Sequence, residues 1–289
     1  QKIWGISLGL IAILTPQVLF FPSNNNYKSG PNLRAGHNQF FEDSMMEMIE
    51  KAAPVSTSPF GALIAMFYEP SRVFAQLEAR RSTWLPAVLV IVSSSALAYW
   101  FFQFVDLAWL QERMISAVND PDAREKQREM GKMGLSRQTM AAFACGGSAF
   151  MLLLMYSLTG LYFAIVGKVR NNDVGFAKGF SLAAWAGVPY LLLFPLGAMQ
   201  IMLASNNQIS FESLNPLTLN QLVFHFEHTH PMAGLLESIS IPMIWSASLL
   251  VIGYQAWAQS TRATALKVVL LPYLAIYGAW LAYALSKTA

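Results

Sequence analysis

Residues 180–204 read FSLAAWAGVPYLLLFPLGAMQIMLA, a run of 25 positions without a charged side chain. Roughly 20 residues of helix cross a hydrocarbon core of about 30 Å, so this stretch is long enough to span a membrane. It lies inside a longer window, residues 179–261, that contains no lysine or arginine. The windows 82–112, 138–167 and 268–286 also lack both residues. Charge is thus confined to short segments between apolar blocks, which is typical of a chain that crosses a membrane several times.

The composition agrees with this interpretation. Hydrophobic residues make up 55% of the 289 positions and charged residues 12%, against about 25% charged in soluble proteins. Leucine, alanine and aromatic residues fill the long apolar stretches, which favours helices over the shorter alternating strands of a barrel. We therefore predict an all-α polytopic membrane protein, a bundle of five transmembrane helices. The predicted spans are residues 84–105, 140–166, 180–204, 239–258 and 268–285.

Charge and cysteine content exclude several classes of function. The net charge of +3 is scattered, and no basic stripe with interleaved aromatic residues suggests a nucleic-acid partner. Cys145 is the only cysteine, so an intramolecular disulfide is impossible, and its place in an apolar span indicates a buried, inert thiol. The lipid bilayer is the first expected partner.

The sequence divides into three parts. Residues 1–22 are hydrophobic and read as an extra spanning helix, with a signal-like segment as the alternative. Residues 23–59 are rich in Asn, Ser, Gly and Pro and read as a linker with one short helix at 42–51. Residues 60–289 form the five-helix membrane domain.

Two segments outside the spans are predicted to be amphipathic. After Glu69-Pro70-Ser71, three apolar residues, Val73, Phe74 and Leu77, fall on one helical face with arginines nearby. This pattern fits a helix lying in the membrane interface, and a helix packing on the bundle is the alternative. Residues 106–139 are predicted to form two helices, the second of which starts at Asp120-Pro121 and carries both signs of charge on a solvated surface.

Basic residues near the span ends set the expected orientation. They place the 60–83 segment and the loops 167–178 and 259–267 in the cytoplasm, and residues 205–238 and the C-terminus outside. The 106–139 loop should be outside by alternation, although it contains six basic residues. Prolines at four positions should free backbone carbonyls and kink the spans; they are Pro189, Pro195, Pro242 and Pro272.

One set of residues resembles a known family. The pattern Gly167-Lys168-x5-Val174-Gly175-Phe176-x3-Phe180-Ser181-x2-Ala184-x4-Pro189 is similar to the loop between the second and third helices of the Yip (Ypt/Rab-interacting protein) family, bacterial branch. The segment Glu69-Pro70-Ser71-x-x-Phe74 and the basic turn at residues 260–265 add to the likeness, which covers about residues 58–287. The acidic-aromatic motifs that eukaryotic members use with small GTPases are not evident.

This resemblance implies a small multi-pass protein of the bacterial cytoplasmic (inner) membrane, without known chemistry. It also implies an association with ABC-type exporters of the MacB kind, through the transporter permease or a periplasmic adaptor. The expected function is therefore a non-catalytic membrane scaffold or accessory subunit. A channel or carrier for an uncharged or lipidic substrate is an alternative.

The only cluster with suggestive chemistry is His225-x2-His228-x-His230, with Glu227 and Glu237 nearby. Imidazole and carboxylate groups bind zinc, copper or nickel, so a metal site is one hypothesis, although the spacing matches no standard site. A solvated outer loop or a pH-sensitive contact is the alternative. The middle of each predicted span lacks an ionisable residue of the kind that proton relays use, and no nucleotide-binding, zincin or hydrolase motif is present. We expect no cofactor and no enzymatic activity.

Overall fold

The computed structural model describes residues 58–78, 84–116, 118, 120–132, 134 and 136–288. They belong to two units, which divide after Ile64. The first unit contributes the start of α3 (Pro59–Ala65), whose first turn is closed by a hydrogen bond of 3.1 Å from Ala62 N to Ser58 O. The second unit holds all the other described helices. The segment 1–22 and the linker helix at 42–51 lie outside the described residues.

Four helical segments of the second unit are long and apolar enough to cross a membrane. They are α5 (Leu85–Phe104), α8 (Arg137–Arg170), the broken segment Phe176–Leu203 and α13 (Arg262–Thr288). The remaining predicted span is α12 (Ile241–Trp257), which is apolar but has 17 residues. The described residues form helices and no strand beyond a single bridge between Thr218 and Ser240. The prediction of an all-helical, multi-pass membrane protein is therefore confirmed.

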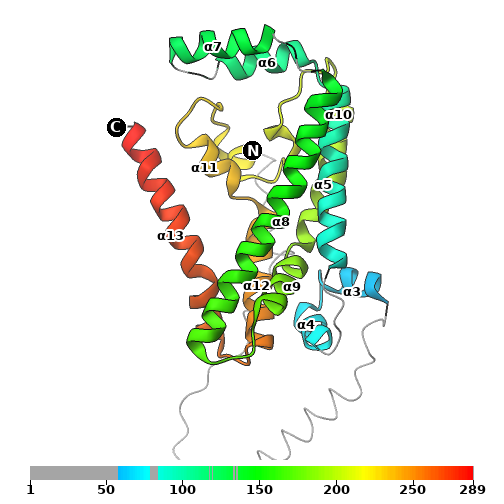
Figure 1. Cartoon of the computed structure of the whole chain (residues 1–289), viewed down its shortest axis with the longest axis vertical. Coiled ribbons are helices and arrows are strands. Elements are labelled where there is room, and N and C mark those ends of the chain that lie inside the picture. The colour runs from blue at the N-terminus through cyan, green and yellow to red at the C-terminus, as the bar shows by residue number, and fades with distance from the viewer. Residues whose placement is uncertain are drawn as a thin grey trace, which may run out of the picture. The chain divides into compact units, whose positions relative to one another are not determined.

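Successive long segments run in opposite directions (Figure 1). One end of the unit, the α6 end, carries α6 (Leu107–Ser116), α7 (Pro121–Lys132) and residues 204–240. The opposite end, the α4 end, carries α4 (Pro70–Glu78) and the turns at 171–175 and 258–261. A hydrogen bond of 2.8 Å from Asp106 N to Asn207 O joins the 106–139 and 205–238 loops. These loops share one end, as alternating passes require.

Two helices follow α5, as the sequence predicted. Asp106 Oδ1 accepts hydrogen bonds from Ala108 N and Trp109 N at 3.0 and 3.2 Å and so caps α6. Asp120 Oδ1 accepts from Asp122 N at 3.0 Å, and Pro121 is the first residue of α7. Carboxylates satisfy the amide groups that a helix start leaves without partners, which fixes both boundaries.

The prolines act differently from one another. The apolar segment Phe176–Leu203 breaks at Pro189. Its first part, α9 (Phe176–Ala186), passes into a 3₁₀ turn, η2 (Val188–Leu192), and then into α10 (Leu193–Leu203). Pro195 lies in the first turn of α10, and Pro272 lies inside α13. The predicted kink at Pro242 is wrong, because Pro242 is the second residue of α12 and a first-turn proline displaces no helical hydrogen bond.

The apolar face of α4 does not face lipid. Val73 and Phe74 are buried, and α4 packs along α12. Trp257 Nε1 donates a buried hydrogen bond of 2.8 Å to Phe74 O, while the Trp257 and Phe74 rings meet edge to face at 5.7 Å. The bundle-packing alternative therefore describes α4 better than the interfacial interpretation. Residues 79–83, which hold Arg80 and Arg81, lie outside the described residues.

Small residues bring α8 and α9 into close contact. A Cβ atom at Gly179 would lie 2.8 Å from Gly160 O and 2.9 Å from Phe163 Cβ, so the two backbones touch at this point. Transmembrane helices associate by this kind of close packing, because lipid supplies no hydrophobic drive between them. The turn that follows α8 is equally tight, since Gly167 lies against Val174 O. The family-like motif thus consists largely of residues that shape this helix pair.

Polar groups connect α5 with α8. Ser95 Oγ lies 3.3 Å from Ser148 Oγ, and Cys145 Sγ donates to Ser95 O at 3.2 Å. The Arg137 guanidinium donates to three carbonyls at the end of α5, those of Phe102, Gln103 and Val105. A cation on the last carbonyls of a helix satisfies their lone pairs and favours the negative end of the helix dipole. Arg137 therefore ties the start of α8 to the end of α5.

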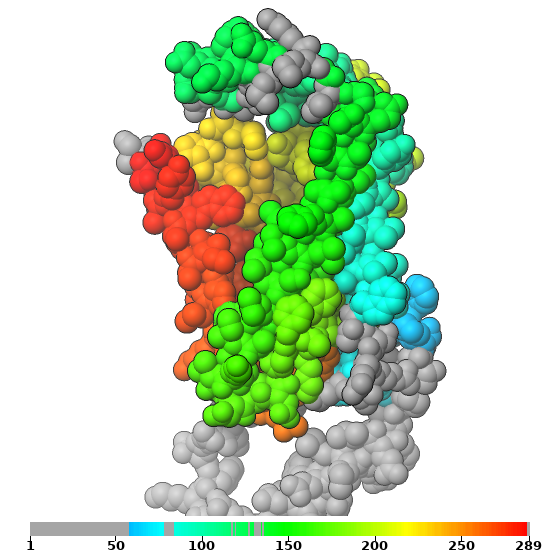
Figure 2. All heavy atoms as spheres, in the orientation of Figure 1, coloured from blue at the N-terminus to red at the C-terminus, as the bar shows by residue number. Residues whose placement is uncertain are grey.

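Among the four long apolar segments that the structure describes, the last helix is the least buried. α13 packs along α12 and on α11 (Ala233–Ser238), and only 11% of its most apolar window is buried. Tyr162 Oη on α8 donates to Val268 O at 2.6 Å near the start of α13. Beyond that point α13 stands apart from α8, and residues of the 204–240 segment are visible between them (Figure 2). Most of α13 therefore offers its apolar side chains to the bilayer.

The glycine contacts lead to a stability prediction. Gly179→Ala should lower the free energy of unfolding by about 1–3 kcal/mol, because the added methyl group has no space between α8 and α9. Gly146→Ala is the matched control: no atom lies within 4 Å of a Cβ there, and alanine favours a helix over glycine by up to about 1 kcal/mol. Thermal unfolding in one detergent measures both, and equal melting temperatures for the two variants would contradict the packing.

Candidate functional site

The α6 end gathers the polar chemistry of the second unit. Residues 204–240 lie between α10 and α12 and contain three short elements: η3 (Glu212–Leu214), the single π turn η4 (Asn220–Phe224) and α11. The bridge between Thr218 and Ser240 attaches the segment to the start of α12, with Leu219 N donating to Ile239 O at 2.7 Å. The segment is thus a folded cap on the bundle.

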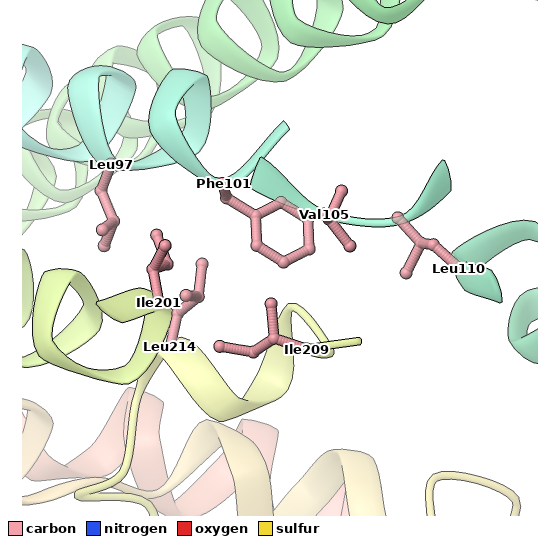
Figure 3. Close-up of a cluster of buried hydrophobic side chains, with 7 residues drawn as sticks. All are labelled: Leu97, Phe101, Val105, Leu110, Ile201, Ile209 and Leu214. Atoms are coloured by element: carbon pink, nitrogen blue, oxygen red, sulfur yellow. The ribbon is translucent and has the colours of Figure 1, made fainter. Parts of the chain in front are cut away.

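An apolar cluster anchors this cap to α5 and α6 (Figure 3). Phe101 and Val105, both fully buried, pack with Ile201 from the end of α10. Ile209 and Leu214 from the cap complete the cluster with Leu97 and Leu110. Because residues more than a hundred positions apart meet here, the position of the cap relative to α6 depends on this cluster.

Asn220 organises the interior of the cap. It is buried, and its side-chain amide pairs with the backbone of Phe226: Phe226 N donates to Asn220 Oδ1 at 2.9 Å, and Asn220 Nδ2 donates to Phe226 O at 3.0 Å. Asn220 Nδ2 also lies 3.3 Å from Glu237 Oε1 on α11. One side chain therefore holds the turn after η4 against α11, and the turn carries the histidines.

His228 lies between two carboxylates. Its Nδ1 is 3.3 Å from Glu212 Oε1 and 3.7 Å from Glu237 Oε2. The side chains of Glu212 and Glu237 are largely buried, and Glu212 Oε2 has no hydrogen-bond partner among the described residues. Burial raises the pKa of Glu237, and the negative charge of Glu212 raises it further, whereas His228, the hydrogen bond from Asn220 and Arg113 act in the opposite direction. His228, Asn220 and Arg113 therefore offset only part of the negative charge of Glu212 and Glu237.

The three predicted histidines are not brought together around one point. Among the described residues, no group of three or more His, Cys, Asp or Glu is arranged to hold a metal ion. His225 is exposed in a left-handed conformation with φ 54°, and His230 stacks on Phe226 at 4.0 Å while its Nδ1 accepts from Met232 N. Only His228 contacts acidic side chains. Metal binding by His225, His228 and His230 stays a prediction.

A pocket of about 800 Å³ opens beside His228 and Glu212. The ends of α5 and α6, together with Ala144 of α8, line one side, and Glu212, Glu227 and His228 of the cap line the other. Arg113 of α6, which lies over the Trp109 ring at 5.5 Å, also lines the pocket. The lining from α5 and α8 is thus apolar, whereas Arg113 of α6 and the acidic residues of the cap supply charge.

Sequence reasoning missed three residues of this site, namely Arg113, Glu212 and Asn220. A signal for Glu212 was present: residues 179–261 contain three glutamates and three histidines but no lysine or arginine. Within that window, histidine is the only side chain that can carry positive charge, so a glutamate–histidine contact was the natural expectation. Asn220 left no signal, because it bonds to backbone groups whose positions depend on the loop conformation.

The fold and the site define a helical, multi-pass integral membrane protein with a polar cap at one end. The chain matches the Yip1 domain over residues 64–284, which is well over half of its length, and it therefore belongs to the Yip1 domain family. No curated protein and no solved structure matches the chain. The resemblance noted from the α8–α9 motif is confirmed.

The shifted pKa of Glu237 leads to a prediction about pH. Because the folded protein raises this pKa above its ordinary value of 4.5, it favours the protonated carboxyl, and deprotonation weakens the fold. The stabilisation is complete below pH 4.5 and is lost as the pH rises through the raised pKa. Glu237→Gln imitates the neutral acid, so it should raise the melting temperature at pH 7 and have no effect near pH 4.

Thermal unfolding across that pH range tests this expectation, with Glu125→Gln on the exposed surface of α7 as the control. A lower melting temperature of Glu237→Gln at pH 7 would show instead that the contact with His228 outweighs the cost of burial.

Proposed function

We propose that this protein is a non-catalytic scaffold or accessory subunit of a membrane complex, and that it recruits partner helices through α8 and α13. The observation that carries the proposal is the uncovered apolar surface of these two helices. Phe143 and Phe150 on α8 and Leu274 and Ile276 on α13 are each more than 60% exposed.

The same surfaces include small residues at helical spacing. Ala142 and Gly146 are exposed on α8, and Gly278 and Ala282 are exposed on α13; no atom lies within 4 Å of a Cβ built at either glycine. Pairs of small residues four positions apart let a second helix approach closely, and such pairs recur at helix–helix interfaces in membranes. No described residue fills either position, so within the described part of the chain both are open to a partner.

The partner class that we propose is an ABC-type exporter of the MacB kind, with its permease or its periplasmic adaptor as the contacting subunit. This part rests on the family likeness. We further propose that all five apolar segments cross the bacterial cytoplasmic membrane. The fifth segment then consists of α12 together with Ser240 and the other residues that flank the helix. With the 17 residues of α12, a span of about 26 Å is within the range that a bilayer accommodates.

In this orientation the α4 end faces the cytoplasm. Its basic residues near the span ends outnumber its acidic ones, and basic residues are retained on the cytoplasmic side. They are Arg72, Lys168, Arg170, Lys178, Arg262 and Lys267, against Glu69, Glu78 and Asp173.

Cysteine labelling in intact cells tests the orientation. In a Cys145→Ser background, Glu125→Cys on α7 should react with an impermeant maleimide added outside, because the α6 end is expected to face the periplasm. Asp173→Cys in the exposed α8–α9 turn should react only after permeabilisation. The reverse pattern would invert the proposed topology.

Affinity purification in mild detergent tests the scaffold itself. The wild-type chain should recover a membrane protein in fixed ratio, and Gly146→Leu or Gly278→Leu should reduce that recovery at least about fivefold, because a leucine separates the helices by more than a contact distance. Gly147→Leu is the matched control: it is equally open but faces a different direction around α8. A pure homogeneous chain without any partner would contradict the proposal.

A further inference from the structure

The pocket beside α6 has two chemically different walls. Phe101, Leu110 and Met114 form part of the wall from α5 and α6, and Phe211 adds an aromatic ring that meets Phe101 edge to face at 5.5 Å. Glu212, Glu227 and His228 form the wall from the cap. An occupant that satisfies both walls must be amphipathic, because apolar surface gains by burial against the rings and charged groups need polar partners.

The depth of the pocket places it at the edge of the hydrocarbon region. α5 has 20 residues and is therefore about 30 Å long, close to the thickness of the hydrocarbon core. Phe101 and Phe102 lie in its last turn and line the pocket. The apolar wall is thus level with the start of the acyl chains next to the glycerol, and the charged wall is level with the headgroups.

Negative and positive side chains line different parts of the pocket. Glu212 lines the pocket, and its carboxylate shares the imidazole of His228 with Glu237 on the neighbouring α11. Glu212 Oε2 is buried without a hydrogen-bond donor in the described part of the chain. Glu227 adds an exposed carboxylate to the same wall. This side of the pocket therefore attracts a cation.

Arg113 supplies the opposite charge. It lines the same pocket from α6, and its guanidinium is held over the ring of Trp109. Arginine presents planar donors that suit phosphate oxygens. A cationic region next to an anionic region matches a headgroup that carries an ammonium and a phosphate a few bonds apart.

We propose that this pocket binds the headgroup of an ethanolamine phospholipid, with the ammonium at Glu212 and Glu227, the phosphate at Arg113 and the start of an acyl chain against Phe101 and Met114. A primary ammonium has three N–H donors for the carboxylates of the cap. The pocket volume of about 800 Å³ is in the range of small-molecule sites and accommodates a headgroup with part of one chain.

Native mass spectrometry of the full chain in detergent tests the proposal directly. Phosphatidylethanolamine and phosphatidylglycerol with identical acyl chains are added in equal amounts; phosphatidylglycerol retains the phosphate but has a neutral glycerol in place of the ammonium. We expect about a tenfold preference for the first bound ethanolamine lipid, the size of one charge-assisted hydrogen bond. Equal binding of the two lipids by the wild type, or no binding of either, would overturn the proposal.

Variants separate the two halves of the headgroup. Glu212→Gln with Glu227→Gln should bring the preference close to one, whereas Glu125→Gln with Glu129→Gln, which removes the same charge from the exposed surface of α7, should leave it unchanged. Arg113→Gln should weaken both lipids alike, since both contain the phosphate. A preference that survives the loss of both glutamates would also overturn the assignment.

The single variant Glu227→Gln keeps the test valid if the double variant does not fold. Glu227 is exposed, so its substitution should leave the melting temperature unchanged and reduce the preference about threefold, a partial loss of one charge-assisted contact. Folding of each variant is checked by circular dichroism, and an unchanged preference in folded Glu227→Gln counts against the proposed site.

Discussion

The need to satisfy every backbone amide without water is the constraint on which the structure depends. In hydrocarbon an unpaired N–H or C=O costs several kcal/mol, so a segment can cross only if its hydrogen bonds close within itself. The long helices of this chain pair their backbone groups internally. Where a helix breaks or ends, nearby groups supply the missing hydrogen bonds. At Gly187 the backbone N–H still reaches Ala183 O and Ala184 O, and the 3₁₀ turn η2 continues the pairing through the break at Pro189. At the end of α5, the Arg137 guanidinium donates hydrogen bonds to carbonyls that would otherwise lack donors.

With backbone pairing settled inside each helix, side chains decide only how the helices meet. Close contact at Gly160 and Gly179 brings α8 onto α9, and the ring of Trp257 holds α4 on α12. The α6 end is built on a different principle. There the chain leaves the helical pattern, and one buried asparagine, Asn220, replaces the missing regular hydrogen bonds. This difference explains why the α4 end consists of tight turns, whereas the α6 end has room for a charged pocket.

Much of the helical framework could be predicted, because it depends on composition over long windows. The gap in basic residues located the spans within a few positions, and Asp120-Pro121 located the start of α7. The environment of α4 could not be predicted from the sequence, since an apolar helical face packs equally well on lipid and on protein. The structure shows that this face packs on α12. The site was harder still. His228 was identified for metal chemistry and Glu237 was noted near it, but its other partner, Glu212, comes from η3, whose position depends on the cluster around Phe101.

The sparse packing of α13 has a consequence for how the molecule responds to its surroundings. Contacts with α12 and α11 hold only part of this helix, so lipid covers more of it than of the other long helical segments. The uncharged stretch of α13 between Lys267 and Lys287 has 19 residues and is about 28 Å long, close to the thickness of the hydrocarbon core. Because less of α13 is buried than of the other long helical segments, a change in bilayer thickness would meet the least resistance from protein contacts at this helix.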